Sequence, residues 1–484
     1  MSENIRNKAF SNILWRLAER TGAQAVAFLV EIVLARLLAP EAFGIIAIVT
    51  VFINVLQVFV DSGMGNALIQ KKNADDIDFS SVFYFNMAVC IVLYGLMFAV
   101  APLIADFYGM PDLTSVVRVL SLMLIISGVC NIQQAYVSRH LIFKRFFYST
   151  LGGTVFAAVV GIVMAYNGFG VWAVVAQQLS RAASAALILW VTVKWRPKLM
   201  FSFERLKGLF SYGWKLLASA LIEVGYRELR SLIIGKLYTT SDLAFYNRST
   251  YFPRFIVSNI NSSIDSVLLP TMSAEQDDRQ RVRAMTRRTI KTSTYIIMPC
   301  MAGLAVCAEP LVRLLLTEKW LPCVPFLRIF CFTYAFYPIH TANLNAMKAL
   351  GRSDLFLKLE IIKKILGLIS VLATMWISVL AMAYSALAVS LCNQIVNSWP
   401  NRKLLDYKYG DQFKDMLPQI ILSLGMGALV YCISFIGLGD ILTLLIQVSL
   451  GAFLYVAGSK LFKIDSFEYL LSIVQGFFMK RKKA

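Results

Sequence analysis

Charged residues are scarce in this chain of 484 residues. They make up 15% of it, against roughly 25% in soluble domains. Apolar residues reach 58%, above the roughly 45–50% that is typical of soluble proteins. A soluble core cannot hide so much apolar surface, so most of that surface must face lipid. The composition therefore excludes an ordinary soluble enzyme and a disordered protein.

Histidine and the common catalytic motifs are also scarce. The only histidines are His140 and His340, and neither has an acidic residue near it in the sequence. The eight cysteines form no C-x-x-C pair, so we interpret them as structural thiols. The sequence contains neither H-E-x-x-H nor a G-x-x-x-x-G-K-[ST] phosphate loop. We therefore expect no metal site, no cofactor, no direct use of ATP and no enzymatic activity.

The apolar residues fall into runs of the length that a transmembrane helix needs, about 20 residues. Two runs, 146–180 and 365–401, are too long for one span. The turn signal Asn167-Gly168-Phe169-Gly170 divides the first run, and we place a turn near Ser378 in the second. The sequence predicts an all-α integral membrane protein with about fourteen spans, near residues 13–37, 42–66, 80–106, 113–137, 147–166, 170–193, 209–236, 243–269, 288–317, 322–347, 357–377, 380–400, 415–436 and 441–460.

The net charge of +19 is unevenly distributed between the loops. Basic residues gather in every second loop and at both chain ends, and the loops between them hold little beyond Lys236 and Lys319. The positive-inside rule then places both termini in the cytoplasm, and the basic excess indicates topology rather than nucleic-acid binding. Arg6 and Lys8 precede no small-residue cleavage site, so we expect an uncleaved first span rather than a signal peptide.

Two parts of the chain resemble each other. The sequence S-N-I-L-W-R-L-A around Trp15 matches S-Y-G-W-K-L-L-A around Trp214, and Val60-Asp61-Ser62 matches Ile264-Asp265-Ser266. The offset grows from 199 (214 minus 15) to 204 (265 minus 61), as small loop insertions would make it. The pattern predicts a parallel duplication in which substrate lies between two halves. We predict lobes at 1–200 and 201–405, two further spans within 406–462, and a basic amphipathic cytoplasmic tail at 463–484.

The tail allows two interpretations. Apolar residues precede the basic run Lys480-Arg481-Lys482-Lys483, which favours an interfacial helix on anionic lipid. A frayed tail whose basic residues only keep the C-terminus on the cytoplasmic side fits the sequence equally well.

Charges inside predicted spans are costly and normally face a wet interior or a partner. Successive residues of a helix are turned by 100°, and at this angle the charged and polar residues of each of the first two spans in each half lie on one face of their helix. We therefore predict a central cavity between the halves. Its candidate cargo-binding residues are basic: Arg16, Arg20, Lys215, Arg227, Arg230, Arg248 and Arg254. Its other polar or ion-coupling candidates are Gln24, Glu31, Asn54, Gln57, Asp61, Glu223, Asn259 and Asp265.

Several arginines indicate an anionic cargo such as a pyrophosphate or an acidic sugar, because the guanidinium fork binds phosphate and carboxylate oxygens. Other roles stay open. Glu223 and Arg227 have the spacing of an ion pair within one helix, and Arg16 and Arg20 lie near enough to the cytoplasm to snorkel. For Asp61 and Asp265 a helix-end or loop contact competes with Na⁺ or H⁺ coupling.

Two segments resemble a known family. Residues 36–44, R-L-L-A-P-E-A-F-G, and 61–70, D-S-G-M-G-N-A-L-I-Q, resemble the N-terminal signature of Wzx-type lipid-linked oligosaccharide flippases. These belong to the multidrug/oligosaccharidyl-lipid/polysaccharide superfamily, and the colanic acid and teichuronic acid exporters are the group most similar to this sequence. The resemblance implies a V of two six-helix lobes with two extra C-terminal helices.

The resemblance also implies a function. An undecaprenyl-pyrophosphate-linked repeat unit would move from the inner to the outer leaflet of the bacterial cytoplasmic membrane by alternating access. The expected partners are this lipid-linked glycan and membrane lipids, with Na⁺ or H⁺ and a polysaccharide polymerase as further candidates, and no nucleic acid. An ion-coupled multidrug antiporter is the main alternative. A membrane-embedded glycan polymerase or ligase is a weaker one, because the chain has no large loop to carry catalysis.

Overall fold

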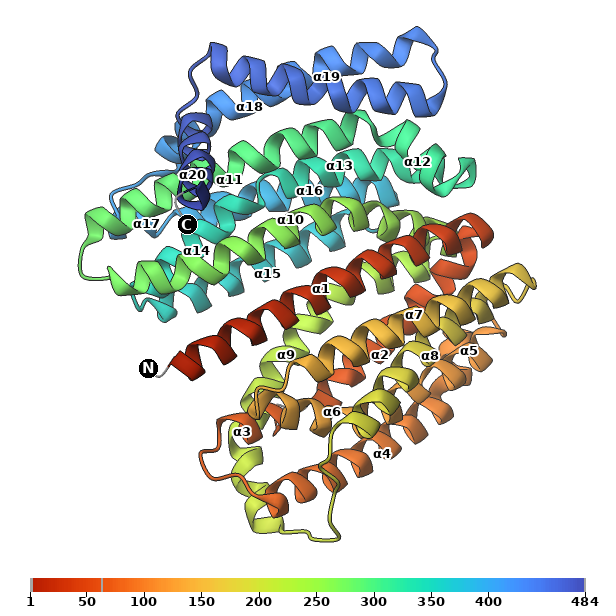
Figure 1. Cartoon of the computed structure of the whole chain (residues 1–484). Coiled ribbons are helices and arrows are strands. Elements are labelled where there is room, and N and C mark those ends of the chain that lie inside the picture. Colours follow the sequence, from red (N-terminus) through yellow and green to blue (C-terminus); the bar gives the residue numbers. More distant parts are fainter. Residues whose placement is uncertain (1–2, 62–63, 483–484) are drawn as a thin grey trace. The chain divides into compact units, whose positions relative to one another are not determined.

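The computed structural model describes the backbone of residues 3–61 and 64–482. It describes side chains in those ranges except at 3–14, 16–20, 211–212, 215, 353, 473–474 and 476–482. Every regular element in the described part is a helix (Figure 1). The chain divides into two compact units, Met1–Ala244 and Phe245–Ala484, and each is described by itself below.

The first unit holds nine complete helices of the described chain and the start of a tenth. They are α1 (Glu3–Leu37), α2 (Pro40–Asp61), α3 (Met64–Gln70), α4 (Asp76–Tyr108), α5 (Leu113–Leu120), α6 (Leu122–Arg139), α7 (Lys144–Tyr166), α8 (Val171–Thr192), α9 (Phe203–Leu237) and the beginning of α10 (Thr240–Ala274).

The second unit holds the rest of α10 and the helices that follow it. They are α11 (Arg279–Val306), α12 (Ala308–Leu316), the 3₁₀ helix η1 (Glu318–Cys323), α13 (Val324–Ala335), α14 (Tyr337–Ala349), α15 (Ser353–Thr374), α16 (Val379–Ser398), α17 (Asn401–Leu404), α18 (Tyr409–Tyr431), η2 (Cys432–Ile436), α19 (Asp440–Leu461) and α20 (Asp465–Lys482).

Both turns predicted inside the long apolar runs are confirmed. Between α7 and α8 the backbone is left-handed at Gly168 (φ 78°) and Gly170 (φ 53°), a conformation that costs glycine little because it lacks a Cβ. Between α15 and α16, Ser378 is extended and its side chain accepts a hydrogen bond from the backbone N–H of Ala381. This N-cap starts α16 where the apolar pattern alone gave no boundary.

Helix length and composition mark the chain as a membrane protein. Among the described residues, nine helices or short helix runs are long and apolar enough to cross a bilayer, and α11 with α12 makes a tenth if that pair, bent by 69°, forms one span. Each of the fourteen predicted ranges coincides with a helix or a run of adjacent helices. The four ranges outside the apolar set lie on α1, α9, α10 and α15, where charged and amide residues interrupt the apolar sequence.

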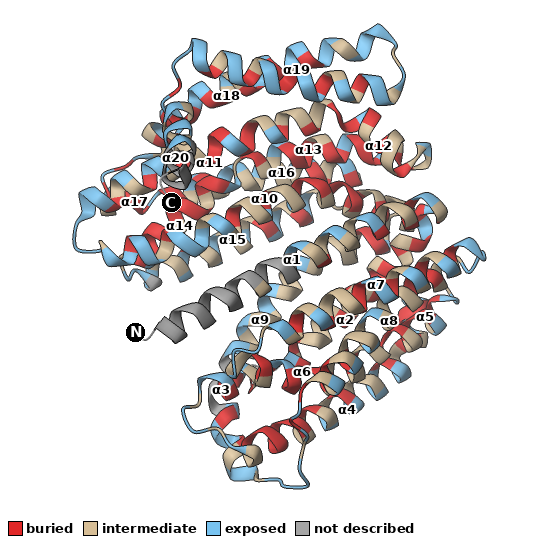
Figure 2. Cartoon of the chain, in the orientation of Figure 1, coloured by how far each residue is buried: buried red, intermediate tan, exposed pale blue. Residues whose placement is uncertain are grey.

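Helix α19 shows how burial is inverted relative to a soluble protein. Its exposed positions include Leu442, Leu445 and Phe453, whereas Thr443 and Gln447 are buried (Figure 2). Large contiguous apolar surface is rare on soluble monomers. Such a surface is stable in a lipid bilayer, where apolar side chains can face the acyl chains. The polar side chains of the helix then face the rest of the bundle.

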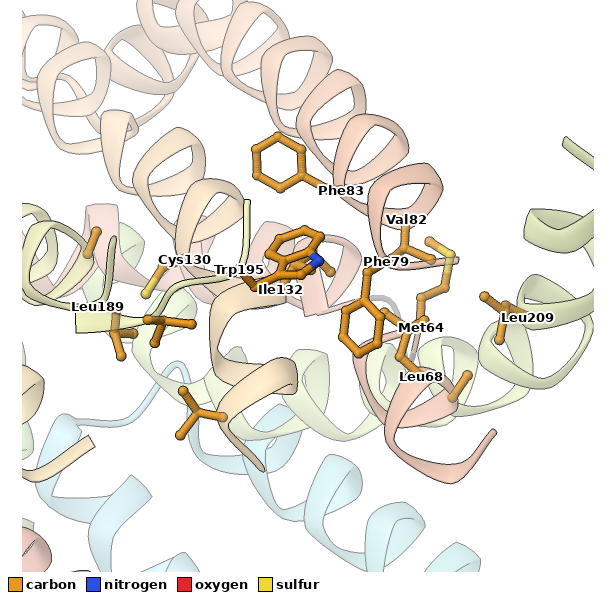
Figure 3. Packing of buried hydrophobic residues seen from close by; sticks show 14 of the residues in the cluster. Met64, Leu68, Phe79, Val82, Phe83, Cys130, Ile132, Leu189, Trp195 and Leu209 are labelled. Carbon is orange, nitrogen blue, oxygen red and sulfur yellow. The ribbon is translucent and has the colours of Figure 1, made fainter. Parts of the chain in front are cut away.

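Helix α9 packs within the first unit. It contacts α2, α3 and α4, and Leu206 and Leu209 at its start join the cluster around Phe79 and Trp195 (Figure 3). The compact units therefore divide after Ala244, whereas the predicted lobes divide at residue 200. Sequence similarity predicts where a repeat begins, but it does not determine which neighbours a helix packs against.

Candidate functional site

The structure places the predicted basic residues in different environments. Arg16, Arg20 and Lys215 lie on helices α1 and α9, but their side chains are outside the described residues. On α9, Arg227 is exposed and Arg230 is half-buried. On α10, Arg248 is buried and Arg254 is exposed.

A polar cluster in the first unit joins α2 to α9. The Asn54 side-chain amide donates to Glu228 Oε1 at 3.1 Å, and Arg227 Nε donates to the same oxygen at 3.3 Å. The Glu228 side chain is 14% exposed and that of Arg227 is 51% exposed. The sequence pattern offered Glu223 as the partner of Arg227, and the recorded ion pair is instead with its direct neighbour Glu228.

The cluster leaves most of the Arg227 guanidinium unused. A guanidinium carries five N–H donors, and the recorded bond uses only the one on Nε. Within the described part of the chain, the four donors on its terminal nitrogens are therefore available to an anion. The Arg227 guanidinium is thus positioned by Glu228 and exposed to solvent, which suits it to bind phosphate or carboxylate oxygens.

The two aspartates of the predicted repeat have matching partners. Asp61, at the end of α2, accepts from Gln57 at 3.2 Å and from Asn131 of α6 at 3.1 Å. Asp265 of α10 accepts from Asn345 of α14 at 2.5 Å. An aspartate of the second predicted span therefore binds an asparagine of the fourth. In the same way, an aspartate of the eighth predicted span binds an asparagine of the tenth.

Arg248 lies inside the second unit. Its side chain packs over the Trp320 ring at 5.1 Å and the Tyr251 ring at 5.8 Å. Arg248 is 8% exposed and Trp320 is fully buried. This cation–π arrangement stabilises a charge away from bulk water, and it distinguishes Arg248 from the exposed Arg254 on the same helix.

The other predicted polar residues differ in burial. Gln24 and Glu31 lie half-buried on α1, Glu223 is exposed on α9, and Asn259 donates to the Phe255 carbonyl of its own helix at 2.8 Å. The structure thus brings together Asn54 with Arg227, and Gln57 with Asp61. It does not record a contact that joins Asn259 to Arg248 or Asp265.

Sequence reasoning missed a second, half-buried polar pair, inside the second unit. Lys363 Nζ lies 2.6 Å from Glu360 Oε1 on α15, with side chains 13% and 29% exposed. In the neighbouring helices of the sequence, His340 Nδ1 of α14 lies 2.9 Å from the side-chain amide nitrogen of Asn397 in α16. The signal was available, because Glu360 and Lys363 fall within a predicted span at ion-pair spacing.

The described residues form no group of three His, Cys, Asp or Glu side chains that could hold a metal ion. All eight cysteines are free thiols, and five of them are buried. They pack as small apolar side chains, consistent with their positions in apolar helices.

Comparison with solved structures defines the fold class. The lipid II flippase MurJ superposes with a TM-score of 0.77 at 15% identity over 94% of this chain and 99% of the other. A multidrug resistance MATE family transporter of the MOP superfamily superposes with a TM-score of 0.63, also at 15% identity, over 81% and 98%. The chain therefore has the fold of this class of membrane proteins.

Sequence comparison then gives the family. Residues 33–325 match the family described as polysaccharide biosynthesis protein, and the chain belongs to this family. The chain is 22% identical to the teichuronic acid biosynthesis protein TuaB of Bacillus subtilis over 78% of this chain and 79% of TuaB. It is 22% identical to the lipopolysaccharide biosynthesis protein WzxC of Escherichia coli over 75% and 74%.

A third relative is matched over a shorter part. The succinoglycan biosynthesis transport protein ExoT of Rhizobium meliloti is 24% identical over 65% of this chain and 64% of ExoT. The predicted resemblance to polysaccharide exporters is confirmed by these matches. The chain therefore belongs to a polysaccharide biosynthesis family, has helices apolar enough to cross a membrane, and shares its fold with MurJ and the MATE transporter.

Proposed function

We propose that the protein flips a polyprenyl-pyrophosphate-linked oligosaccharide repeat unit from the inner to the outer leaflet of the bacterial cytoplasmic membrane. The observation that carries this proposal is the exposed Arg227 guanidinium, held by Glu228 on the long helix α9 of a polysaccharide biosynthesis protein. Undecaprenyl pyrophosphate is the lipid carrier that we expect, because the family resemblance implies it.

The physical need for such a protein is clear. A hydrated, charged headgroup cannot cross hydrocarbon unaided, because its polar groups would lose their hydrogen bonds to water. Guanidinium groups would replace those hydrogen bonds at the pyrophosphate, while the polyprenyl tail stays in the bilayer. Arg16, Arg20, Lys215, Arg230 and Arg254 are the further basic residues that we propose for this role.

The proposed topology has fourteen spans with both termini in the cytoplasm. The positive-inside rule supports the orientation, and the helix at every predicted range supports the count. We propose that 1–200 and 201–405 move as pseudo-symmetric lobes in alternating access. The two helices of 406–462 follow them, and the tail at 463–484 is basic.

Repeated features support the duplication behind this mechanism. Helices α1 and α9 have 35 residues each, and each is followed after two residues by the next helix, α2 or α10. The pairs Asp61–Asn131 and Asp265–Asn345 occupy matching places in this scheme. Coupling to Na⁺ or H⁺ and contact with a polysaccharide polymerase are further parts of the proposal.

The experiment is deletion of the gene, followed by analysis of the lipid-linked intermediates that accumulate. We expect one polyprenyl-pyrophosphate glycan to accumulate in the inner leaflet, and its sugars would identify the cargo. Normal surface polysaccharide without accumulation would contradict the proposal. Ion-driven dye efflux from proteoliposomes that hold the purified protein would instead support a multidrug antiporter.

A further inference from the structure

A cationic cavity lies in the second unit, where α20 meets α11. Its volume is about 390 Å³, and the side chains that line it are mainly polar. From α11 come Arg287, Arg288, Lys291 and Thr292, and from the start of α20 come Asp465, Ser466 and Tyr469. This end of α11 belongs to the predicted cytoplasmic side of the membrane, because its first turns lie in the basic segment 270–287.

The charges around the cavity do not cancel. Arg287 binds both carboxylate oxygens of Asp415, at 2.6 and 2.7 Å. Lys291 lies 3.0 Å from Asp465 and 3.6 Å from Asp415. Three cations therefore face two carboxylates, and the remaining positive charge is that of Arg288.

Arg288 is held without an acidic partner among the described residues. Its guanidinium lies 4.5 Å from the centre of the Tyr469 ring, and the side chain is exposed. Stacking on an aromatic face fixes the plane of a guanidinium while its edge N–H donors stay available. An arginine held in this way is prepared to bind an oxyanion in the cavity.

Helix α20 is fixed to the second unit beside the cavity. Phe467 and Leu470 pack against the buried cluster of Tyr295 and Tyr455, and the Tyr295 and Phe467 rings lie 6.5 Å apart. The same helix therefore offers polar residues to the cavity and apolar residues to the bundle. This packing favours the ordered helix over the frayed tail that the sequence also allowed.

The surface next to the cavity favours a lipid as the source of the anion. Leu461 and Phe462, at the end of α19 shortly before Asp465, are 76% and 69% exposed. Such side chains face acyl chains in a membrane protein, so a polar cavity beside them lies at the level of the headgroups. We propose that this cavity binds the phosphate of an anionic phospholipid of the cytoplasmic leaflet, with Arg288 as its main ligand.

The test uses the purified full-length protein and native mass spectrometry with phosphatidylglycerol or phosphatidylcholine. We expect phosphatidylglycerol to bind more tightly, and Arg288→Gln to weaken its binding about tenfold, as loss of a hydrogen bond between charged groups would. Arg279→Gln is the matched control. It removes the same charge from the same helix at an exposed position outside the cavity, so its binding should stay unchanged.

A second variant separates binding from folding. Tyr469→Leu keeps an apolar side chain but removes the ring under Arg288, and we expect it to weaken phosphatidylglycerol binding about threefold. Equal losses in Arg288→Gln and Arg279→Gln would overturn the proposal, because they would show a general charge effect. If equimolar inorganic phosphate displaced the lipid, the result would overturn the proposal that the bound phosphate belongs to a phospholipid. The assay requires no transport, so its outcome is independent of the flippase proposal.

Discussion

The two units share a hydrogen-bond pattern but use their arginines differently. In the first unit Asp61 binds Asn131, and in the second Asp265 binds Asn345. Arg227 of the first unit is exposed beside Glu228, whereas Arg248 of the second is buried over Trp320. Similar aspartate contacts thus accompany very different surroundings for the basic residues.

The difference separates two tasks. The aspartate–asparagine pairs join helices within a unit, α2 to α6 in the first and α10 to α14 in the second, so we expect both copies of the predicted duplication to need them. A cation that meets cargo must be reachable; Arg227 is exposed, whereas Arg248 is 8% exposed and packs over the Trp320 ring, and a cargo role for either residue stays a prediction. The exposed and the buried arginines can therefore be tested apart, by export in one case and by stability in the other.

The largest effect is expected at Trp320, on which Arg248 rests. Trp320→Ala removes a fully buried ring, and we expect a loss of about 3 to 5 kcal/mol in the free energy of unfolding. Unfolding by SDS titration in mixed micelles measures it. The control is Trp214→Ala, because Trp214 is 49% exposed and should cost well under half as much. Equal losses would contradict the burial of the Trp320 ring beneath Arg248.

Charge reversal at Arg227 tests the exposed arginine. Arg227→Glu removes the donors proposed for the pyrophosphate and adds a second carboxylate beside Glu228. We expect export to fall about tenfold or more, since a charged hydrogen bond contributes about 1.5 to 3 kcal/mol. Surface polysaccharide per cell is the readout, with membrane insertion checked by immunoblotting. Arg279→Glu is the control, and normal export in Arg227→Glu would remove this residue from the proposed site.

The shared pattern itself is tested by two double-mutant cycles. One uses Asp61→Ala with Asn131→Ala, and the other uses Asp265→Ala with Asn345→Ala. We expect a coupling energy of about 1.5 to 3 kcal/mol in each, because each pair makes one hydrogen bond to a charged carboxylate. SDS unfolding of the single and double variants gives these values. Coupling in one unit and none in the other would show that the two pairs are not equivalent.

A small pH effect should mark the contact that fixes α9 to the first unit. Arg205 Nη1 lies 2.6 Å from both Asp75 carboxylate oxygens, and this hydrogen bond lowers the pKa of the Asp75 carboxyl from 3.8. A lowered carboxyl pKa contributes stability that is present above pH 3.8 and is lost as the pH falls through the folded-state pKa.

The melting temperature should therefore fall more steeply below pH 4 in the natural protein than in Arg205→Gln. The two curves should run parallel above pH 5. Parallel curves throughout the acid range would show that this ion pair adds nothing to the attachment of α9.

The sequence was sufficient to predict the helices and less able to predict their partners. Turn residues located the break at Gly168, because such a signal acts over a few residues, whereas the break near Ser378 was inferred only from the length of the apolar run. The role of Glu228 could not be predicted, since nothing in the sequence showed that Asn54 would meet it across 174 positions. The partner of Asp265 was hidden for the same reason, as Asn345 lies 80 residues further on.

Some site features depend on packing that local pattern does not encode. Arg248 shared a predicted face with Asp265, yet Trp320 supplies its surroundings from η1. Helix α9 begins the second predicted repeat but packs with α2, α3 and α4. Tertiary contacts decide both cases, so helix-face geometry alone could not predict them.

The most direct measurement is lipid translocation by the purified protein in proteoliposomes. A polyprenyl-pyrophosphate oligosaccharide carrying a fluorophore on its glycan is placed in both leaflets and quenched from outside. The account predicts that the natural protein moves the protected half into reach of the quencher and that Arg227→Glu does so at least about tenfold more slowly. Equal rates for both proteins, or no translocation above protein-free vesicles, would contradict it.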